Sequence, residues 1–245
     1  MSEVYDRIGR SYARTRRPDP RIAAQIDDAL GDARTVVNVG AGTGSYEPRD
    51  RPVVAVEPST EMLRQRSPGA APAVRAVAEA LPFADGSFDA ALAVLTVHHW
   101  TDQAAGLREL RRVSRRQVVF FFEPLHTHDF WALAYWPEAK ALPSEVAPPD
   151  EALLRAHLEV RAVRRLLVPN DCVDGFGAAF WSRPEAYLDP EVQAGMSWLA
   201  LLPDDVRARG TERLRADLAS GEWDRRHGHL RSEQTFDAGY RLAVT

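Results

Sequence analysis

The sequence predicts an α/β protein built on a mostly parallel sheet. Short, nearly continuous apolar runs at residues 35–39, 53–56 and 88–95 are typical of parallel strands that are buried on both faces. Segments with apolar residues at helical spacing lie beside these runs, as connections between parallel strands require. A glycine-rich turn over residues 40–44 follows the first run, and turns at the carboxyl ends of parallel strands are where such sheets bind ligands.

Composition excludes several classes of protein. The 245 residues are 45% hydrophobic and 27% charged, which is typical of a soluble globular protein with a sizeable core. A net charge of −4 argues against a nucleic-acid surface as the main partner. The single cysteine, Cys172, excludes an internal disulfide framework, and no apolar stretch suggests a leader or a membrane anchor. We therefore expect a cytoplasmic protein without a membrane or nucleic-acid partner.

The first elements can be placed by residue pattern. Residues 3–15 and 22–30 carry apolar residues at helical spacing, and the second of these helices is expected to close at Gly31. Strands are expected at 35–39 and 53–56. Only eight residues separate Gly44 from Val53, and two of them are prolines. Since a crossover helix needs about ten or more residues, we expect it to be reduced to about one turn.

The rest of the sheet follows the same logic. Ser59 is the expected N-cap of a second crossover helix, and Asp102 that of a third. Strands are expected at 73–77, 88–95 and 117–122, the second of these being apolar enough to lie at the centre of the sheet.

The last 120 or so residues are harder to interpret. Sixth and seventh strands are expected within 160–168 and 240–244. The expected helices are an aromatic one near 131–136 and others at 148–157, 189–201 and 203–219, the last ending near Gly221. So long an insertion between the two strands predicts a substrate-facing cap. The aromatic residues there line a pocket or form the cap's own core, and we expect the core role for most of them: Phe176, Phe180, Trp181, Tyr187, Trp198 and Trp223.

The glycine turn and the next strand form one candidate site. Glycines permit positive φ and let a ligand approach the backbone closely. The next strand ends in Glu57, where a carboxylate can accept hydrogen bonds from a ribose diol. The third glycine comes one residue too early for the dinucleotide fingerprint G-x-G-x-x-G, with Ser45 in its place. A pyrophosphate ligand is therefore the less natural interpretation.

Three stretches resemble one known family. The run V-N-V-G-A-G-T-G-S-Y (residues 37–46), followed by the acidic Glu57, resembles motifs I and II of class I S-adenosylmethionine-dependent methyltransferases. The stretches at 78–89 (A-E-A-L-P-F-A-D-G-S-F-D) and 94–100 (V-L-T-V-H-H-W) resemble its type 11, small-molecule branch. The resemblance implies a Rossmann-like, seven-stranded, mostly parallel sheet with helices on both faces, a helical cap and an antiparallel last strand.

The resemblance also implies an activity, and the long insertion described above adds a domain plan. The activity is in-line methyl transfer from S-adenosylmethionine to a small-molecule acceptor, leaving S-adenosylhomocysteine. The plan is a cofactor-binding core with N-terminal helices over 1–125, a cap over 126–235 that includes the sixth strand, and a last strand in 236–245 that returns to the sheet. A monomer or a homodimer fits equally well, and the acceptor and the methylated atom stay open.

The matching positions are the candidate site residues. An arm at the N-terminus would supply Tyr12 or Arg17, and Val77 stands where the family commonly has an adenine-contacting aspartate. The candidate cofactor-binding residues are Tyr12, Arg17, Asn38, Gly40, Ala41, Gly42, Thr43, Gly44, Glu57, Pro58, Met62, Ala78, Glu79, Ala80, Leu95, Thr96 and His99.

Two histidines are the candidates for catalysis. His98 and His99 follow the fourth strand, where a base would remove a proton from the acceptor; a structural, hydrogen-bonding role is the alternative. The nearby His126, His128 and Asp129 lack the spacing of a metal site, so no metal is expected. Two other functions compete with methyl transfer: a dinucleotide-dependent oxidoreductase, and a protein that binds the cofactor without transferring its methyl group.

Overall fold

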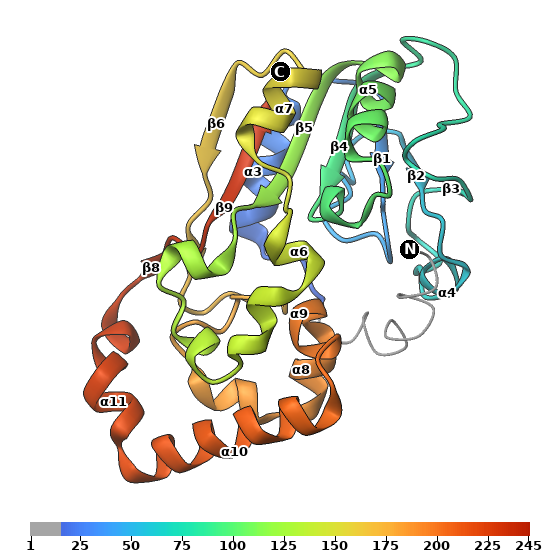
Figure 1. Cartoon of the computed structure of the whole chain (residues 1–245). Helices are drawn as coiled ribbons and strands as arrows, with labels where there is room; N and C mark the ends of the chain where they lie inside the picture. Colours follow the sequence, from blue (N-terminus) through green and yellow to red (C-terminus); the bar gives the residue numbers. More distant parts are fainter. Residues whose placement is uncertain (1–15) are drawn as a thin grey trace.

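A seven-stranded sheet crosses the upper half of the molecule, and a layer of helices lies below it (Figure 1). The computed structural model describes residues 16–245, so Tyr12 and the helix expected over 3–15 lie outside the described residues. The strands run in the order β3-β2-β1-β4-β5-β9-β6. They are β1 (Val36–Val39), β2 (Val53–Val56), β3 (Ala73–Val74), β4 (Phe88–Val94), β5 (Ser114–Phe122), β6 (Ala162–Arg165) and β9 (Tyr240–Val244).

The pairing confirms the expected topology. Strands β3, β2, β1, β4 and β5 are paired in parallel, and β9 inserts antiparallel between β5 and β6. The register places Asn38 of β1 between Ala55 of β2 and Leu92 of β4. The ends of β1, β2 and β4 therefore meet at one edge, where polar groups that follow the strands converge.

Alternation along the strands builds two separate cores. In β5, Val118 and Phe120 belong to the cluster that contains α3 (Pro20–Leu30), whereas Val119 and Phe121 belong to the cluster that contains α5 (Gln103–Val113). Successive side chains of a strand point to opposite faces, so a strand with a helix on each face is apolar throughout. All four of these side chains are buried.

Local signals set the ends of the helices. The Asp19 side chain accepts from the amide of Arg21 to start α3, and Gly31 closes it at φ 56°. The expected caps are confirmed: Ser59 Oγ accepts from Met62 N at the start of α4 (Thr60–Arg64), and Asp102 accepts from Ala105 N at the start of α5. The other α-helices within residues 16–245 are α6 (Pro143–Val146), α7 (Glu151–His157), α8 (Pro190–Gly195), α9 (Ser197–Ala200), α10 (Asp204–Ser220) and α11 (Glu222–His227).

The connection between β1 and β2 differs from the expectation. A helical turn was expected there, but residues 40–52 form bends and turns without a helix. An ion pair between Glu47 and Arg66 occupies this region, with side chains only 7% and 6% exposed. Arg66 also donates to the carbonyl of Gly42 at 3.2 Å and to that of Ala71 at 2.9 Å. Side-chain hydrogen bonds thus hold the turn where a helix usually would.

The predicted ends of several other strands and helices were wrong. The third strand ends at Val74 rather than at residue 77. The stretch expected as one sixth strand divides into β6 and β7 (Val168–Pro169), and β7 pairs with β8 (Thr235–Phe236) in a separate two-stranded sheet. The helix expected over 189–201 breaks at Met196, whose ψ of 111° is extended. The aromatic helix near Trp131 is a run of 3₁₀ turns, whereas Gly221 ends α10 as expected.

Aromatic side chains fill the helical layer below the sheet. Trp131 lies edge-on to Tyr187 and to Trp223 with ring centroids 5.3 Å apart in each pair, a favourable arrangement for aromatic rings. Of the six aromatic residues singled out from the sequence, five are buried: Phe176, Trp181, Tyr187, Trp198 and Trp223. Most of them pack within this helical layer, whereas Phe176 and Trp198 also reach a cavity described below.

Candidate functional site

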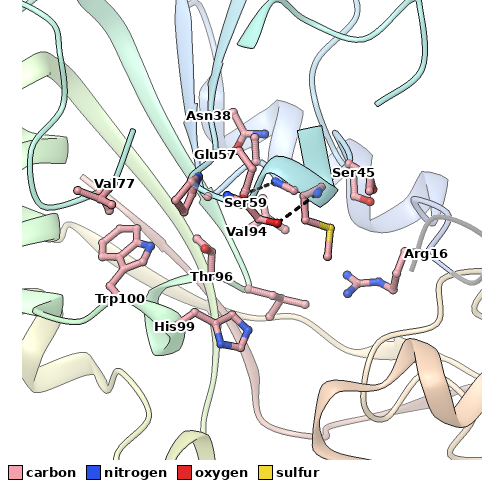
Figure 2. Close-up of a pocket in the computed structure, with 18 of the residues that line it drawn as sticks. Arg16, Asn38, Ser45, Glu57, Ser59, Val77, Val94, Thr96, His99 and Trp100 are labelled. Atoms are coloured by element: carbon pink, nitrogen blue, oxygen red, sulfur yellow. Dashed lines mark hydrogen bonds between the residues drawn. The ribbon is translucent and has the colours of Figure 1, made fainter. Parts of the chain in front are cut away.

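A cavity of about 180 Å³ opens at the carboxyl ends of β1, β2 and β4 (Figure 2). Most of the residues proposed from the sequence lie together in its wall. These residues are Asn38, Gly40, Ala41, Gly42, Thr43, Glu57, Pro58, Met62, Ala78, Glu79, Leu95, Thr96 and His99.

The glycine turn forms one wall of this cavity. Gly40, Gly42 and Gly44 all have positive φ, at 70°, 53° and 98°. A Cβ on Gly40 would lie 2.0 Å from Thr96 Oγ1, whereas a Cβ on Gly42 would meet nothing within 4 Å. Gly40 is therefore required by close packing, and Gly42 leaves open space where a ligand can approach the backbone.

Glu57 holds the turn from the end of β2. One carboxylate oxygen accepts from Gly42 N at 2.8 Å, and the other accepts from Ser59 N at 2.8 Å. Each oxygen can accept a further hydrogen bond, since a carboxylate has about four lone-pair sites. The side chain is largely buried yet lines the cavity, so it can meet a diol there.

Asn38 adds an unsatisfied polar atom to the same region. Its Nδ2 donates to Glu47 Oε1 at 3.3 Å, while its buried Oδ1 has no hydrogen-bond partner within residues 16–245. Buried acceptors are normally paired, so this atom is suited to a ligand donor. Asn38, Glu57 and the open space at Gly42 fit an amino-acid-bearing nucleoside such as S-adenosylmethionine.

The opposite end of the cavity is more apolar. Met62, Val77, Ala78 and Trp100 line it, and Val77 is 47% exposed. Glu79 also borders this end, but its Oε1 accepts from the amides of Thr101 and Asp102 at 2.7 and 3.1 Å. An apolar slot of this kind suits the flat face of a nucleobase.

The two histidines lie on the 3₁₀ turn Val97–His99 that follows β4. Their ring centroids are 3.7 Å apart. Burial holds the pKa of His98 well below its usual range, and the neighbouring His99 lowers this pKa further. Burial, with the nearby Arg16 guanidinium, lowers the pKa of His99 to about 3. Both imidazoles are therefore neutral at physiological pH.

A second, smaller cavity adjoins the first. His98 lines only this one, while Arg16, Leu95 and His99 line both. Leu95 has a φ of 47°, which is uncommon for a side-chain-bearing residue and costs conformational energy. Four aromatic side chains line the second cavity together with polar residues such as Ser144, Glu145 and Ser197; the aromatic ones are Phe122, Phe176, Trp198 and Tyr240.

Some predicted residues lie elsewhere. Arg17 is exposed and is not in either cavity wall, and its neighbour Arg16 takes that place. Gly44 and Ala80 lie outside the cavity walls, and Gly44 instead packs near Glu47 and Arg66. The cavity residues absent from the sequence-based set are Arg16, Ser45, Ser59, Val77, Val94, Trp100 and Thr101.

Several of these additional cavity residues are neighbours in sequence of residues that the sequence had already indicated. Ser59 and Trp100 directly follow Pro58 and His99, and Val77 precedes Ala78. For Arg16, no feature of the local sequence distinguishes it from the adjacent Arg17. Among the described residues, no three His, Cys, Asp or Glu side chains are placed to hold a metal ion, and no helix is long and apolar enough to cross a membrane.

Comparison with known proteins identifies the family. A family profile described as a methyltransferase domain matches residues 37–122. A protein of Anabaena variabilis, described as a methyltransferase from an antibiotic biosynthesis pathway, is 34% identical; the match covers 94% of this chain and 98% of that one, with a TM-score of 0.87.

Curated relatives match about half of this chain. The demethylmenaquinone methyltransferase of Mycolicibacterium vanbaalenii is 38% identical over 45% of this chain and 46% of its own length. The ubiquinone/menaquinone biosynthesis C-methyltransferase of Geotalea uraniireducens is 33% identical over 48% and 53%. The chain thus spans about half the length of the curated relatives it matches. With the glycine turn, Glu57 and the full-length likeness to the Anabaena protein, this chain belongs to the S-adenosylmethionine-dependent methyltransferases.

Proposed function

We propose that this protein transfers a methyl group from S-adenosylmethionine to a small-molecule acceptor. The observation that carries the proposal is the glycine turn tied to Glu57, at the rim of a cavity that meets a second cavity at Leu95 and His99. A two-substrate transfer needs two adjoining compartments with their ligands aligned at the junction.

The cofactor would lie along the first cavity. The backbone of residues 40–43 would hold its methionine moiety, Glu57 its ribose, and Met62, Ala78 and Glu79 the edges of its adenine. Asn38 Oδ1 is the acceptor available to the ammonium group. Arg16 lies at the junction, where a guanidinium can pair with the methionine carboxylate.

The chain's own contribution is alignment and exclusion of water. When bound, S-adenosylmethionine supplies an electrophilic methyl group on a good leaving group. The contact between Gly40 and Thr96 fixes the floor of the cavity, and Leu95 and His99 border the junction. Rigid side chains at such a junction favour in-line approach of the acceptor and keep competing water out.

We propose that the histidines act as neutral hydrogen-bonding groups rather than as general bases. A base works best when its pKa is near the working pH, and the pKa of both rings is far below it. His98 Nδ1 is buried without a hydrogen-bond partner among the described residues. An imidazolium there would leave an N–H unsatisfied, so proton uptake by His98 is disfavoured.

The acceptor would enter from the cap. Ser144, Glu145, Phe176 and Trp198 bring residues of the segment 126–235 to the second cavity, which supports the division into a cofactor-binding core and an acceptor-facing cap. The aromatic walls suit a small, largely apolar acceptor with a few polar groups. We propose a cytoplasmic monomer or homodimer acting on such a compound.

Calorimetric titration with S-adenosylmethionine, S-adenosylhomocysteine and NAD tests the cofactor. Binding of both sulfur compounds and not of NAD supports the proposal. Candidate acceptors can then be screened by measuring the release of S-adenosylhomocysteine. Binding of NAD alone would replace methyl transfer with dinucleotide chemistry. Binding without product from any acceptor class would favour a protein that holds the cofactor without transferring its methyl group.

A further inference from the structure

A buried carboxylate of the segment 126–235 forms an ion pair with the arginine at the junction of the two cavities. Asp174 is fully buried, and its Oδ1 accepts from Arg16 Nε at 2.8 Å. The Arg16 side chain is itself only 8% exposed. Figure 2 shows its guanidinium directed into the first cavity, on the side opposite Trp100.

The other contacts of Asp174 fix its orientation. Its Oδ1 also accepts from Gly175 N at 2.7 Å, and its Oδ2 accepts from Tyr46 Oη at 2.8 Å. Burial, together with Asp174, raises the pKa of Tyr46, so its hydroxyl stays a donor. Tyr46 ends the glycine turn and has a φ of 61°. The carboxylate therefore joins the cap, the glycine turn and Arg16 in one network.

This network lies where a helix would otherwise assist the cofactor. A helix N-terminus after a glycine turn attracts an anion, but the connection between β1 and β2 contains no helix. A guanidinium is the alternative group for a carboxylate, provided that its position is fixed before the ligand arrives. The bond to Asp174 is made by Nε, and Figure 2 shows the end of the guanidinium directed toward the cavity.

We propose that Asp174 is a positioning residue, which holds the Arg16 guanidinium against the carboxylate of the cofactor's methionine moiety. The inference rests on the proposed function, because it needs that cofactor. It makes recognition of the amino-acid part of the ligand depend on a cap residue that lies 158 positions from the arginine. Recognition of the nucleoside part does not depend on this residue.

Two ligands separate these parts. S-adenosylhomocysteine carries the amino-acid moiety, and 5′-methylthioadenosine has the same nucleoside without it. In Asp174→Asn we expect the affinity for S-adenosylhomocysteine to fall about tenfold, equivalent to ~1.4 kcal/mol, and the affinity for methylthioadenosine to stay within about twofold. If Asp174 had only a structural role, the substitution would lower the affinity for both ligands equally, and that outcome would overturn the inference.

Asp19→Asn is the matched control. Asp19 is likewise fully buried and paired with an arginine, but that arginine, Arg21, lines neither cavity. We expect the ratio of the two affinities to be unchanged in this variant. A shift as large as that of Asp174→Asn would show that loss of any buried carboxylate in this region has the same effect, against the inference.

A double-mutant cycle covers the case in which Asp174→Asn does not fold. The double variant Arg16→Gln/Asp174→Asn contains no unpaired buried charge from this pair. If Asp174 acts through Arg16, the double variant and Arg16→Gln alone will have the same affinity ratio, and a further fall in the double variant contradicts the inference. If the unmodified protein binds neither compound, the proposed function itself fails. If it binds both equally well, only the positioning role of Asp174 is overturned.

Discussion

Gly40 and Thr96 are in such close contact that no side chain fits between them. A Cβ on Gly40 would lie 2.0 Å from Thr96 Oγ1 and 2.8 Å from Thr96 Cβ. The first residue follows β1 and the second follows β4, so their contact closes the floor of the cavity at the point where the two strand ends meet.

Gly40→Ala should therefore destabilise the fold as well as the site. Positive φ costs about 1–2 kcal/mol for an alanine, and the overlap with Thr96 adds about 1–3 kcal/mol. We expect the free energy of unfolding in urea to fall by about 2–5 kcal/mol. Gly42→Ala is the control, since it has positive φ but no neighbour within 4 Å, and should lose only the first part. Equal losses in the two variants would rule out the Thr96 contact as the cause.

Glu57→Gln should abolish most cofactor affinity. A glutamine would turn its NH₂ group toward the amide of either Gly42 or Ser59, replacing an acceptor with a donor. It would also lose charge-assisted bonds to ribose hydroxyls, which contribute about 1.5–3 kcal/mol each. We expect calorimetry to show affinity for S-adenosylhomocysteine at least about 100-fold weaker. Glu61→Gln removes the same charge from α4, outside the cavity wall, and should bind normally; equal weakening there would point to net charge instead.

Local patterns were sufficient to predict the sheet and the central part of the site. The β-branched run before Gly40 and the carboxylate after Val56 are signals that lie within a few residues of the atoms they position. The seven-stranded, mostly parallel sheet, the antiparallel β9 and the caps Ser59 and Asp102 agree with the sequence-based prediction.

The choice between Arg16 and Arg17 depended on a distant partner. Two adjacent arginines are equivalent by composition and spacing, and the buried Asp174, 158 residues away, pairs with the first of them. The missing helix between β1 and β2 has a similar origin. Glu47 and Arg66, 19 residues apart, together support the turn. Such a pair cannot be predicted from a periodic pattern in the sequence.

Glu47→Ala should cost more stability than removal of both members of that pair. Arg66 would stay buried beneath Gly42 without its carboxylate, and breaking a buried pair costs about 3–5 kcal/mol. Glu47→Leu/Arg66→Met removes both charges, so we expect a smaller loss of unfolding free energy in urea. A double variant less stable than Glu47→Ala would contradict this account and show that the bonds of Arg66 to the carbonyls of Gly42 and Ala71 matter more than the pair.

The low pKa of His98 should make the protein less stable as the pH falls. Its folded pKa lies well below the ordinary value of 6.5, so the unfolded chain takes up a proton that the folded chain does not. The stabilisation is fully present above pH ~6.5 and is lost as the pH falls below it, by about 2 kcal/mol between pH 7 and 5 for one such group. Urea unfolding at both values should show this loss in the unmodified protein and a loss about 2 kcal/mol smaller in His98→Gln. If His98→Gln shows the same loss as the unmodified protein, His98 takes up a proton in the folded protein as well, and it can no longer be excluded as a general base.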